Sequence, residues 1–434
     1  MKDEPATLAA APKTLSTALP RRVELTAVIV LLAIYWLMAF GWLRISTITA
    51  DEGFHLLSGY AYWSEGDFRY QSENGNLPQR LGAVPLLFFS EKPLIPDTPA
   101  RENGNHFDLA AQFLWQSGND PQAMILSGRL MMLSTVGLGL CLAVYFYARR
   151  LWGAKGGLIS LFLAVFSTDL LAHGGLITSD TTFALLMLLS LACVWKMLHR
   201  VSLPIVLGTG LVLGLTAVAK FSAPLIGVMA LIMWVVCLIK NPAVSAGLLK
   251  AREISGRVKK FAAQFAGFAV AAVVAWVVLW AFYDFRFSGV PEGYPTAYSN
   301  SDSDLFLRCL SLQNPEAVRN LTSQEDVDAA IENIGGLVPG TLRKLIEWQK
   351  DSPIKLLPEA YVHGFLHTYA FSLQRSAFLL GERSNVGWRK YFVVTFLLKT
   401  PLPVFGLMAL ALVAAAAAIA RQKQGERLPW AENW

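Results

Sequence analysis

Charged residues are scarce in this chain. They make up 16% of its 434 residues, whereas 54% are hydrophobic and the mean hydropathy is +0.44. Water-soluble domains carry about 25% charged residues, so the composition excludes an ordinary soluble globular protein. Aromatic residues reach 12%, and with long apolar runs they can bury ample surface, which excludes a disordered chain. The composition therefore indicates a membrane-embedded protein.

The chain also has few cysteines and only a small net charge. The four cysteines form no disulfide framework, and Cys141, Cys193 and Cys237 lie in apolar runs, where cysteine behaves as a small hydrophobe. The 37 basic and 31 acidic residues leave a net charge of +6. In membrane proteins Lys and Arg accumulate on the cytoplasmic side, which can account for this excess of basic residues. We therefore expect the protein to lie in a lipid bilayer and to have no nucleic-acid partner.

Long apolar runs predict an all-α polytopic membrane protein. A span needs about 20 apolar residues, and eight segments come near that length. The predicted spans are Leu25–Ile45, Met124–Tyr147, Gly157–Ala172, Thr181–Leu198, Leu203–Ala219, Ala223–Ile239, Ala262–Phe282 and Tyr391–Ala420. The last is long and contains Pro401 and Pro403, so its start is expected near Pro403.

The positive-inside rule gives the orientation. With the N-terminus in the cytoplasm, the cytoplasmic segments hold 18 Lys and Arg residues and the short outer loops hold one. Residues 1–24 are then a cytoplasmic tail, 25–283 a module of seven spans with a long outer loop at 46–123, 284–390 an outer segment with amphipathic helices, and 391–434 the last span and a cytoplasmic tail.

Acidic residues are nearly absent from the middle of the chain. Only Asp169, Asp180 and Glu253 lie between Gln122 and Tyr283. Glu253 is in a basic cytoplasmic loop and is expected to be solvated, whereas the other two flank the outer end of the third span. Acidic groups at membrane depth are costly and usually serve a site or have a partner.

Three groups of polar residues converge on the outer face. Asp51 and Glu52 follow the first span, with His55 one helical turn after Asp51. Asp180 opens the fourth span, with His173 shortly before it. The third group is cationic and consists of Arg129, Lys220 and Arg286.

Carboxylates and cations at one membrane face suit a reaction on a lipid-linked anion. A carboxylate can act as a general base toward a hydroxyl, and Arg or Lys can hold a phosphate through charge-assisted hydrogen bonds. Simpler roles stay open for each group. Asp51 and Glu52 can be a charged helix start, Asp180 an N-cap, and Arg129 and Lys220 snorkelling cations.

The motifs resemble those of type C (GT-C) membrane glycosyltransferases. Asp51-Glu52-Gly-Phe-His55 followed by Gly66-Asp67-Phe68-Arg69 resembles the first outer loop of the protein O-mannosyltransferases and lipid A aminoarabinose transferases. The segments around Asp180 and Lys220 resemble later motifs of this family, as do those that begin at Tyr283 and Gly387. The resemblance covers roughly residues 25–410 and implies a GT-C-like bundle.

The resemblance also implies a reaction. A sugar would pass with inversion from a polyprenyl-phosphate donor to a protein or lipid acceptor on the periplasmic side of a bacterial inner membrane. Asp51 would be the general base, and Glu52, His55 and Asp180 would position the acceptor or Asp51, or share a metal. His55 and His173 are also candidate substrate-binding residues. Arg129, Lys220 and Arg286 would hold the phosphate. No cofactor is required, and use of Mg²⁺ or Mn²⁺ stays open because carboxylate oxygens suit both ions.

Two departures from the family pattern bear on this interpretation. Many members carry His-Pro-Pro-Leu where this chain has Asn74-Gly75-Asn76-Leu77-Pro78, and most have more spans. Two other functions therefore remain as alternatives: a transporter or flippase of lipid-linked sugars, and a non-catalytic protein that keeps the fold. We expect a transferase to have Asp51, Asp180 and Lys220 lining one outer cavity, whereas Asp51 and Asp180 on separate surfaces would count against it.

Overall fold

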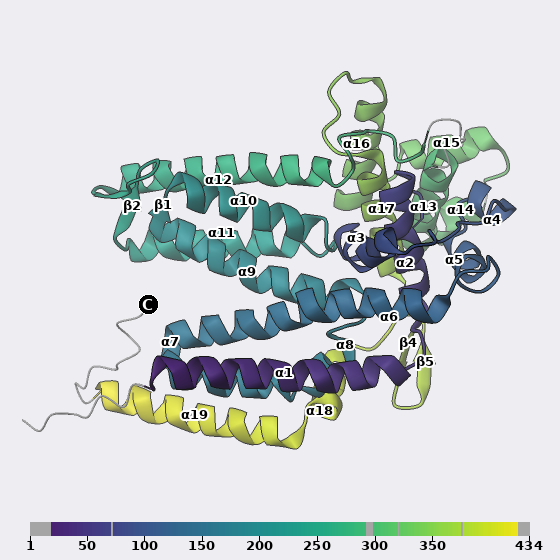
Figure 1. Cartoon of the computed structure of the whole chain (residues 1–434). Coiled ribbons are helices and arrows are strands. Elements are labelled where there is room, and N and C mark those ends of the chain that lie inside the picture. Colours follow the sequence, from purple (N-terminus) through teal and green to yellow (C-terminus); the bar gives the residue numbers. More distant parts are fainter. Residues whose placement is uncertain (1–18, 71–72, 292–297, 320, 375, 424–434) are drawn as a thin grey trace, which may run out of the picture.

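The computed structural model describes residues 19–70, 73–291, 298–319, 321–374 and 376–423. Most of the predicted cytoplasmic tails lie outside these residues. The described chain is mostly helical, with a bundle of long helices and a cap of short elements at one end (Figure 1). That end, which carries α2–α5 and α13–α17, is called the outer end below. The opposite, inner end carries β1–β3 and the beginning of α1.

Among the described residues, four helices are long and apolar enough to cross a membrane: α1 (Arg21–Ile45), the Pro121–Val165 helix, α9 (Ser179–His199) and α12 (Arg257–Ala281). A fifth candidate is a pair bent by 105°, α18 (Tyr391–Lys399) with α19 (Leu402–Lys423). The bend falls at Thr400 and Pro401, so α19 begins at Leu402, next to Pro403, where the sequence predicts the start of the last span. Two shorter apolar helices, α10 (Leu203–Ala217) and α11 (Pro224–Lys240), complete the bundle. These helices confirm the all-α class.

The Pro121–Val165 helix is folded back on itself. It comprises α6 (Pro121–Met132), the π-helical turn η2 (Leu133–Gly137) and α7 (Leu138–Val165). Non-helical dihedrals occur at Trp152 and Gly153, where Gly153 has φ of 72°. A Cβ added to Gly157 would lie 3.0 Å from the Tyr145 ring, although twelve residues span about 18 Å in a straight helix. The chain therefore reverses at Gly153 and returns toward the outer end.

The inner end is closed by a small sheet. Its strands are β1 (Arg200–Val201), β2 (Val244–Ala246) and β3 (Arg252–Ile254), with β1 parallel and β3 antiparallel to β2. Close by, Glu24 in the first turn of α1 pairs with Arg149 at 2.6 Å and accepts a hydrogen bond from Tyr145. The ion pair joins the inner end of α1 to α7.

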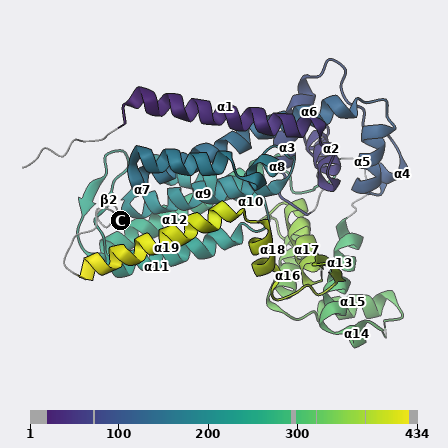
Figure 2. The same cartoon turned by 90° about the horizontal axis from the view of Figure 1, so that it is seen from below.

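The outer elements form two groups (Figure 2). One follows α1 and the other follows α12, so both long polar segments of the sequence lie at the same end of the bundle. The first group contains α2 (Ala50–Ser64), α3 (Leu77–Ala83), the 3₁₀ turn η1 (Val84–Phe88), α4 (Pro99–Glu102) and α5 (His106–Trp115). The second contains α13 (Tyr298–Gln313), α14 (Pro315–Arg319), α15 (Gln324–Glu332), α16 (Leu337–Asp351), α17 (Glu359–Leu373) and the hairpin β4 (Ala377–Leu379) with β5 (Glu382–Ser384). The short α8 (Thr168–His173) precedes α9.

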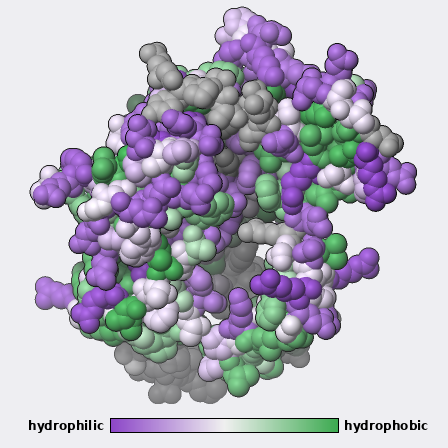
Figure 3. Space-filling model, turned by 90° about the vertical axis from the view of Figure 1, so that its right-hand side faces the viewer, coloured by the Kyte–Doolittle hydropathy of each residue, from purple (hydrophilic) through white to green (hydrophobic). Residues whose placement is uncertain are grey.

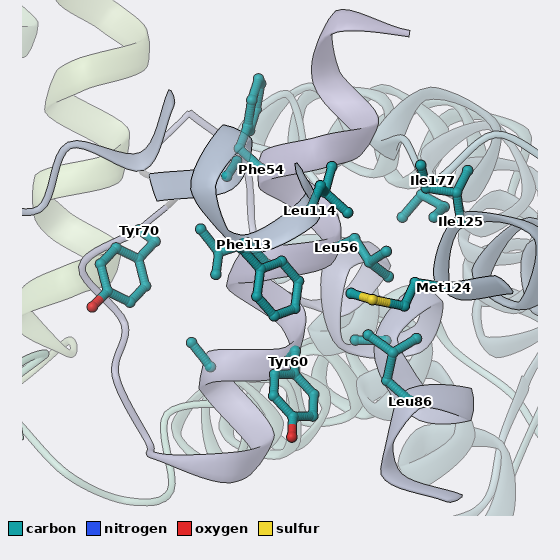
Figure 4. Packing of buried hydrophobic residues seen from close by; sticks show 14 of the residues in the cluster. Phe54, Leu56, Tyr60, Tyr70, Leu86, Phe113, Leu114, Met124, Ile125 and Ile177 are labelled. Carbon is teal, nitrogen blue, oxygen red and sulfur yellow. The ribbon is translucent and has the colours of Figure 1, made fainter. Parts of the chain in front are cut away.

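Helix α2 is the centre of the outer core. Its side chains from Glu52 to Tyr62 are buried against α3, α5 and α6, and Figure 4 shows Leu56 and Tyr60 among Phe113, Met124 and other apolar groups. A Cβ on Gly59 would lie 1.9 Å from the carbonyl oxygen of Gln79, so only glycine allows α2 and α3 to approach this closely. This packing gives the start of α2 a fixed position.

Candidate functional site

Glu52 and Arg129 form a buried ion pair. The Arg129 Nη2 and Nε atoms lie 2.6 and 2.8 Å from the two Glu52 carboxylate oxygens, and the two side chains are 3% and 0% exposed. Arg129 also donates to the carbonyl oxygens of Leu43, Ser46 and Thr47. The bidentate pair therefore ties the start of α2 and the end of α1 to α6.

Backbone groups hold Glu52 as well. Its carboxylate accepts hydrogen bonds from the N–H groups of Thr49, at 3.0 Å, and Ile177, at 3.3 Å. The contact with Thr49 caps the start of α2. Desolvation raises the pKa of Glu52, but the hydrogen bonds from Arg129, Thr49 and Ile177 outweigh it and leave the pKa below its ordinary value. Glu52 is therefore held as a carboxylate, and several protein donors already surround it.

His55 lies one turn further along α2 and is buried. Its Nδ1 is 2.7 Å from the carbonyl oxygen of Ile177, to which the neutral ring donates, so the Nε2 carries the lone pair. Burial lowers the pKa of His55 and outweighs the opposing effects of the Ile177 carbonyl, Asp51, Glu52 and Asp180. Through Ile177, both Glu52 and His55 fix the segment that leads into α9.

Asp180 and Lys220 form a second ion pair, which is open to solvent. Asp180 begins α9 and Lys220 follows α10, and their side chains are 76% and 29% exposed. The neighbouring Ser179 donates to the Asn74 side chain at 2.9 Å. The Asn74–Pro78 segment, where this chain departs from the family pattern, thus adjoins the start of α9.

Asp51 is exposed at the start of α2 and makes no hydrogen bond to any described residue. Asp51 and Asp180 both lie close enough to His55 to act on its pKa. The first and second acidic motifs thus both act on the buried His55, and Lys220 is bound to Asp180. Seen from the outer end, the molecule is hollowed between surfaces rich in hydrophilic side chains (Figure 3).

His173 and Arg286 are also predicted to belong to the site, but their hydrogen bonds are with other segments of the chain. The exposed His173 contributes its backbone carbonyl, which accepts a hydrogen bond from Thr181 and so supports the start of α9. Arg286 donates to the carbonyl oxygen of Gly66 and lies 5.3 Å from the centre of the Phe68 ring. Arg286 thus joins the end of the α12 segment to the Gly-Asp-Phe-Arg motif, in which Asp67 and Arg69 form a buried ion pair at 2.6 Å.

Helix α17 contacts the site from the outer segment. Phe221, directly after Lys220, packs against Tyr361 at 5.1 Å and Phe365 at 5.9 Å between ring centres. Thr368 donates to the carbonyl oxygen of Glu73 at 2.9 Å, next to Asn74. The sequence alone assigns no role to Phe221 or Asn74, because an apolar or amide side chain carries no motif of its own. Their positions become informative only once α17 lies across the site.

Histidines gather where α2, α5 and α17 meet. Of the six in the chain, His55, His106, His363 and His367 lie here. His363 is bonded through Nδ1 to Asp302 at 2.6 Å, and the rings of His363 and His367 are 6.4 Å apart. Among the described residues, no three His, Cys, Asp or Glu side chains are grouped to hold a metal ion.

No family model, curated protein or solved structure matches this chain. A function can therefore be proposed only from the sequence motifs and from the geometry of the site residues.

Proposed function

We propose that the protein is a membrane glycosyltransferase that transfers a sugar from a polyprenyl-phosphate donor to a hydroxyl of a protein or lipid acceptor, with inversion. The observation that carries this proposal is the meeting of Asp51 and the Asp180–Lys220 pair around the buried His55. Exposed carboxylates with a half-buried cation at one end of a membrane bundle suit base catalysis on a phosphate-linked substrate.

The role proposed for each residue follows from how exposed its side chain is. Asp51 takes the proton of the acceptor hydroxyl while the hydroxyl oxygen bonds to the anomeric carbon. The bond from that carbon to the phosphate oxygen breaks, and its electron pair leaves with the polyprenyl phosphate. Lys220 offsets the phosphate charge, and Asp180 positions Lys220. Glu52 and Arg129, which are buried against each other, position α2 and do not contact substrate.

The proposed topology has eight crossings. Reversal of the chain at Gly153 divides the Pro121–Val165 helix into two antiparallel segments, which supports counting it twice. The helices α10 and α11, of 15 and 17 residues, would be short crossings within the bundle, and the bent α18–α19 pair would be the eighth. Basic residues at the inner end support a cytoplasmic inner face and a periplasmic site in a bacterial inner membrane.

The distribution of charge distinguishes this function from transport. In α1, α9 and α12, charged side chains stand near the helix ends, for example Arg44, Asp180 and Lys260. Secondary transporters place their substrate and ion sites near the middle of the membrane. Charges confined to the ends therefore favour a site at the outer surface.

The test is transfer of labelled sugar from a polyprenyl-phosphate donor in membranes that contain the full chain. Asp51→Asn should lower the rate about 10²- to 10⁴-fold because the general base is lost. Asp97→Asn removes the same charge from an exposed position in the same outer loop and should retain the wild-type rate. Near-normal transfer by Asp51→Asn would show that Asp51 is not the general base. Absence of transfer by the wild-type protein would count against the proposed glycosyltransferase activity.

A further inference from the structure

A groove of about 490 Å³ lies between the outer ends of α1 and α6. Its apolar walls include Leu43, Ile48, Ile125 and Leu126, and Trp115 lies at its side. Polar groups enter it from the connection between α1 and α2. The groove shares none of its lining residues with the Asp51, Asp180 and Lys220 cluster, so it is a separate feature of the outer end.

The groove has one cation free to bind an anion. Arg44, in the last turn of α1, is exposed and has no carboxylate or other hydrogen-bonding partner within the described part of the chain. The other cation in the groove is Arg129, whose Nε, Nη1 and Nη2 atoms all donate to protein oxygens. Arg44 therefore gives the groove a single uncompensated positive charge, on the membrane side that usually carries few cations.

The groove lies at the depth expected for lipid headgroups. Only 22% of the most apolar stretch of α1 is buried inside the protein, so most of this helix faces outward. Near its outer end Trp42 is 49% exposed, and Trp115 across the groove is 60% exposed. Tryptophan is enriched where lipid tails meet the headgroups, so the two side chains place this level at the membrane interface.

We propose that the groove binds one anionic glycerophospholipid. The headgroup phosphate pairs with Arg44. Ser46 and Thr47 also line the groove, and their hydroxyl groups form hydrogen bonds with the headgroup oxygens. An acyl chain lies along Ile125 and Leu126, which face the groove from α6. The lipid thereby joins the outer ends of α1 and α6 where the Glu52–Arg129 pair also holds them.

Charge and position both favour a phospholipid. One free guanidinium balances one negative charge, which is the charge of a phosphodiester such as phosphatidylglycerol. A polyprenyl-phosphate sugar is also a monoanionic phosphodiester, but its phosphate would have to lie beside Lys220 and Asp51 to react, and neither residue lines the groove. The inference thus concerns a site apart from the proposed reaction and stands without it.

The test measures lipid binding to the purified full-length protein in detergent by native mass spectrometry. Dioleoylphosphatidylglycerol should bind more tightly than dioleoylphosphatidylcholine, and Arg44→Ala should weaken phosphatidylglycerol binding about tenfold and abolish the preference. Arg150→Ala removes an exposed cation at the inner end and should leave the preference unchanged. Leu126→Trp fills the groove without altering charge and should also weaken binding.

Three results would overturn the proposal: equal binding of both lipids to the wild type, an unchanged preference in Arg44→Ala, or an equal loss in Arg150→Ala. Displacement of phosphatidylglycerol by an equimolar polyprenyl-phosphate sugar, with the same dependence on Arg44, would assign the groove to the donor and reject the phospholipid. Because Arg44 is exposed, its replacement should leave the fold intact, and circular dichroism of each variant checks this.

Discussion

Two acid–base pairs at the outer end have the same chemistry and opposite surroundings. Glu52–Arg129 is almost completely buried and receives additional hydrogen bonds from backbone groups. Asp180–Lys220 is open, with Asp180 76% exposed. Exposed pairs contribute about 0–1 kcal/mol to stability, whereas removing one partner of a buried pair costs about 3–5 kcal/mol. The buried pair thus holds α1, α2 and α6 together, and the open pair remains accessible to solvent.

The largest effect is expected from breaking the buried pair. Arg129→Met should lower the free energy of unfolding by about 3–5 kcal/mol because the Glu52 carboxylate is left buried without its partner. Thermal unfolding in detergent and the yield of monodisperse protein measure the loss. The double variant Glu52→Gln with Arg129→Met should recover part of the stability, since no buried charge remains. A fully stable Arg129→Met variant would show that the pair is not what holds these helices.

A change in the open pair should separate activity from stability. Lys220→Met should lower sugar transfer about 10²-fold, as for loss of one group that stabilises charge in the transition state. Its effect on the free energy of unfolding should stay within about 1 kcal/mol. Both quantities are measured on the same preparation, by labelled-sugar transfer and by thermal unfolding. Equal and large losses in both would mean that Lys220 is structural, like Arg129.

The last comparison concerns pH, which distinguishes charged from neutral contacts. Desolvation lowers the pKa of both His106 and His367 from 6.5 to about 4, and the neighbouring charges of His55, His363 and Arg308 act in the same direction. As the pH falls from 6.5 toward 4, the unfolded chain takes up protons that the folded protein does not bind. The free energy of unfolding should therefore decrease over this range.

Thermal unfolding between pH 7.5 and pH 4.5 measures this dependence. His367→Phe should flatten it, because a phenyl ring can stack on Phe371 as His367 does and takes up no proton. His173→Gln, at an exposed ring, should leave the dependence as in the wild type. The Glu52–Arg129 pair should contribute little here, since the pKa of Glu52 is held below its ordinary value. An equally steep pH dependence in His367→Phe would contradict the assignment.

Local sequence features predicted much of the fold. Apolar run length located the long helices, and the predicted start of the last span near Pro403 agrees with the start of α19 at Leu402. Asp120, Pro121 and the hydrogen bonds from Gln122 and Ala123 begin α6 by ordinary capping. Run length also indicated that α10 and α11 are short, because the predicted spans Leu203–Ala219 and Ala223–Ile239 have 17 residues each and the helices have 15 and 17.

The candidate site was predictable only in part. The outer ends of the spans and the sign of each charge follow from the sequence, so Asp51, Asp180 and Lys220 could be assigned to one face. Which charges neutralise each other could not be derived in this way. Arg129 lies 77 residues from Glu52, and Lys220 lies 40 residues from Asp180. Such pairing depends on how distant segments pack.

The sequence by itself determined a helical membrane protein with its scarce acidic groups concentrated at the outer end, because hydropathy and charge act through solvent and lipid along each short segment. Only the tertiary structure decided that Glu52 and Arg129 neutralise each other in the core, while Asp51, Asp180 and Lys220 stay accessible around His55. Burial sets that difference: an ionised group taken out of water must find its partner within the protein, and an exposed one keeps water until a substrate replaces it.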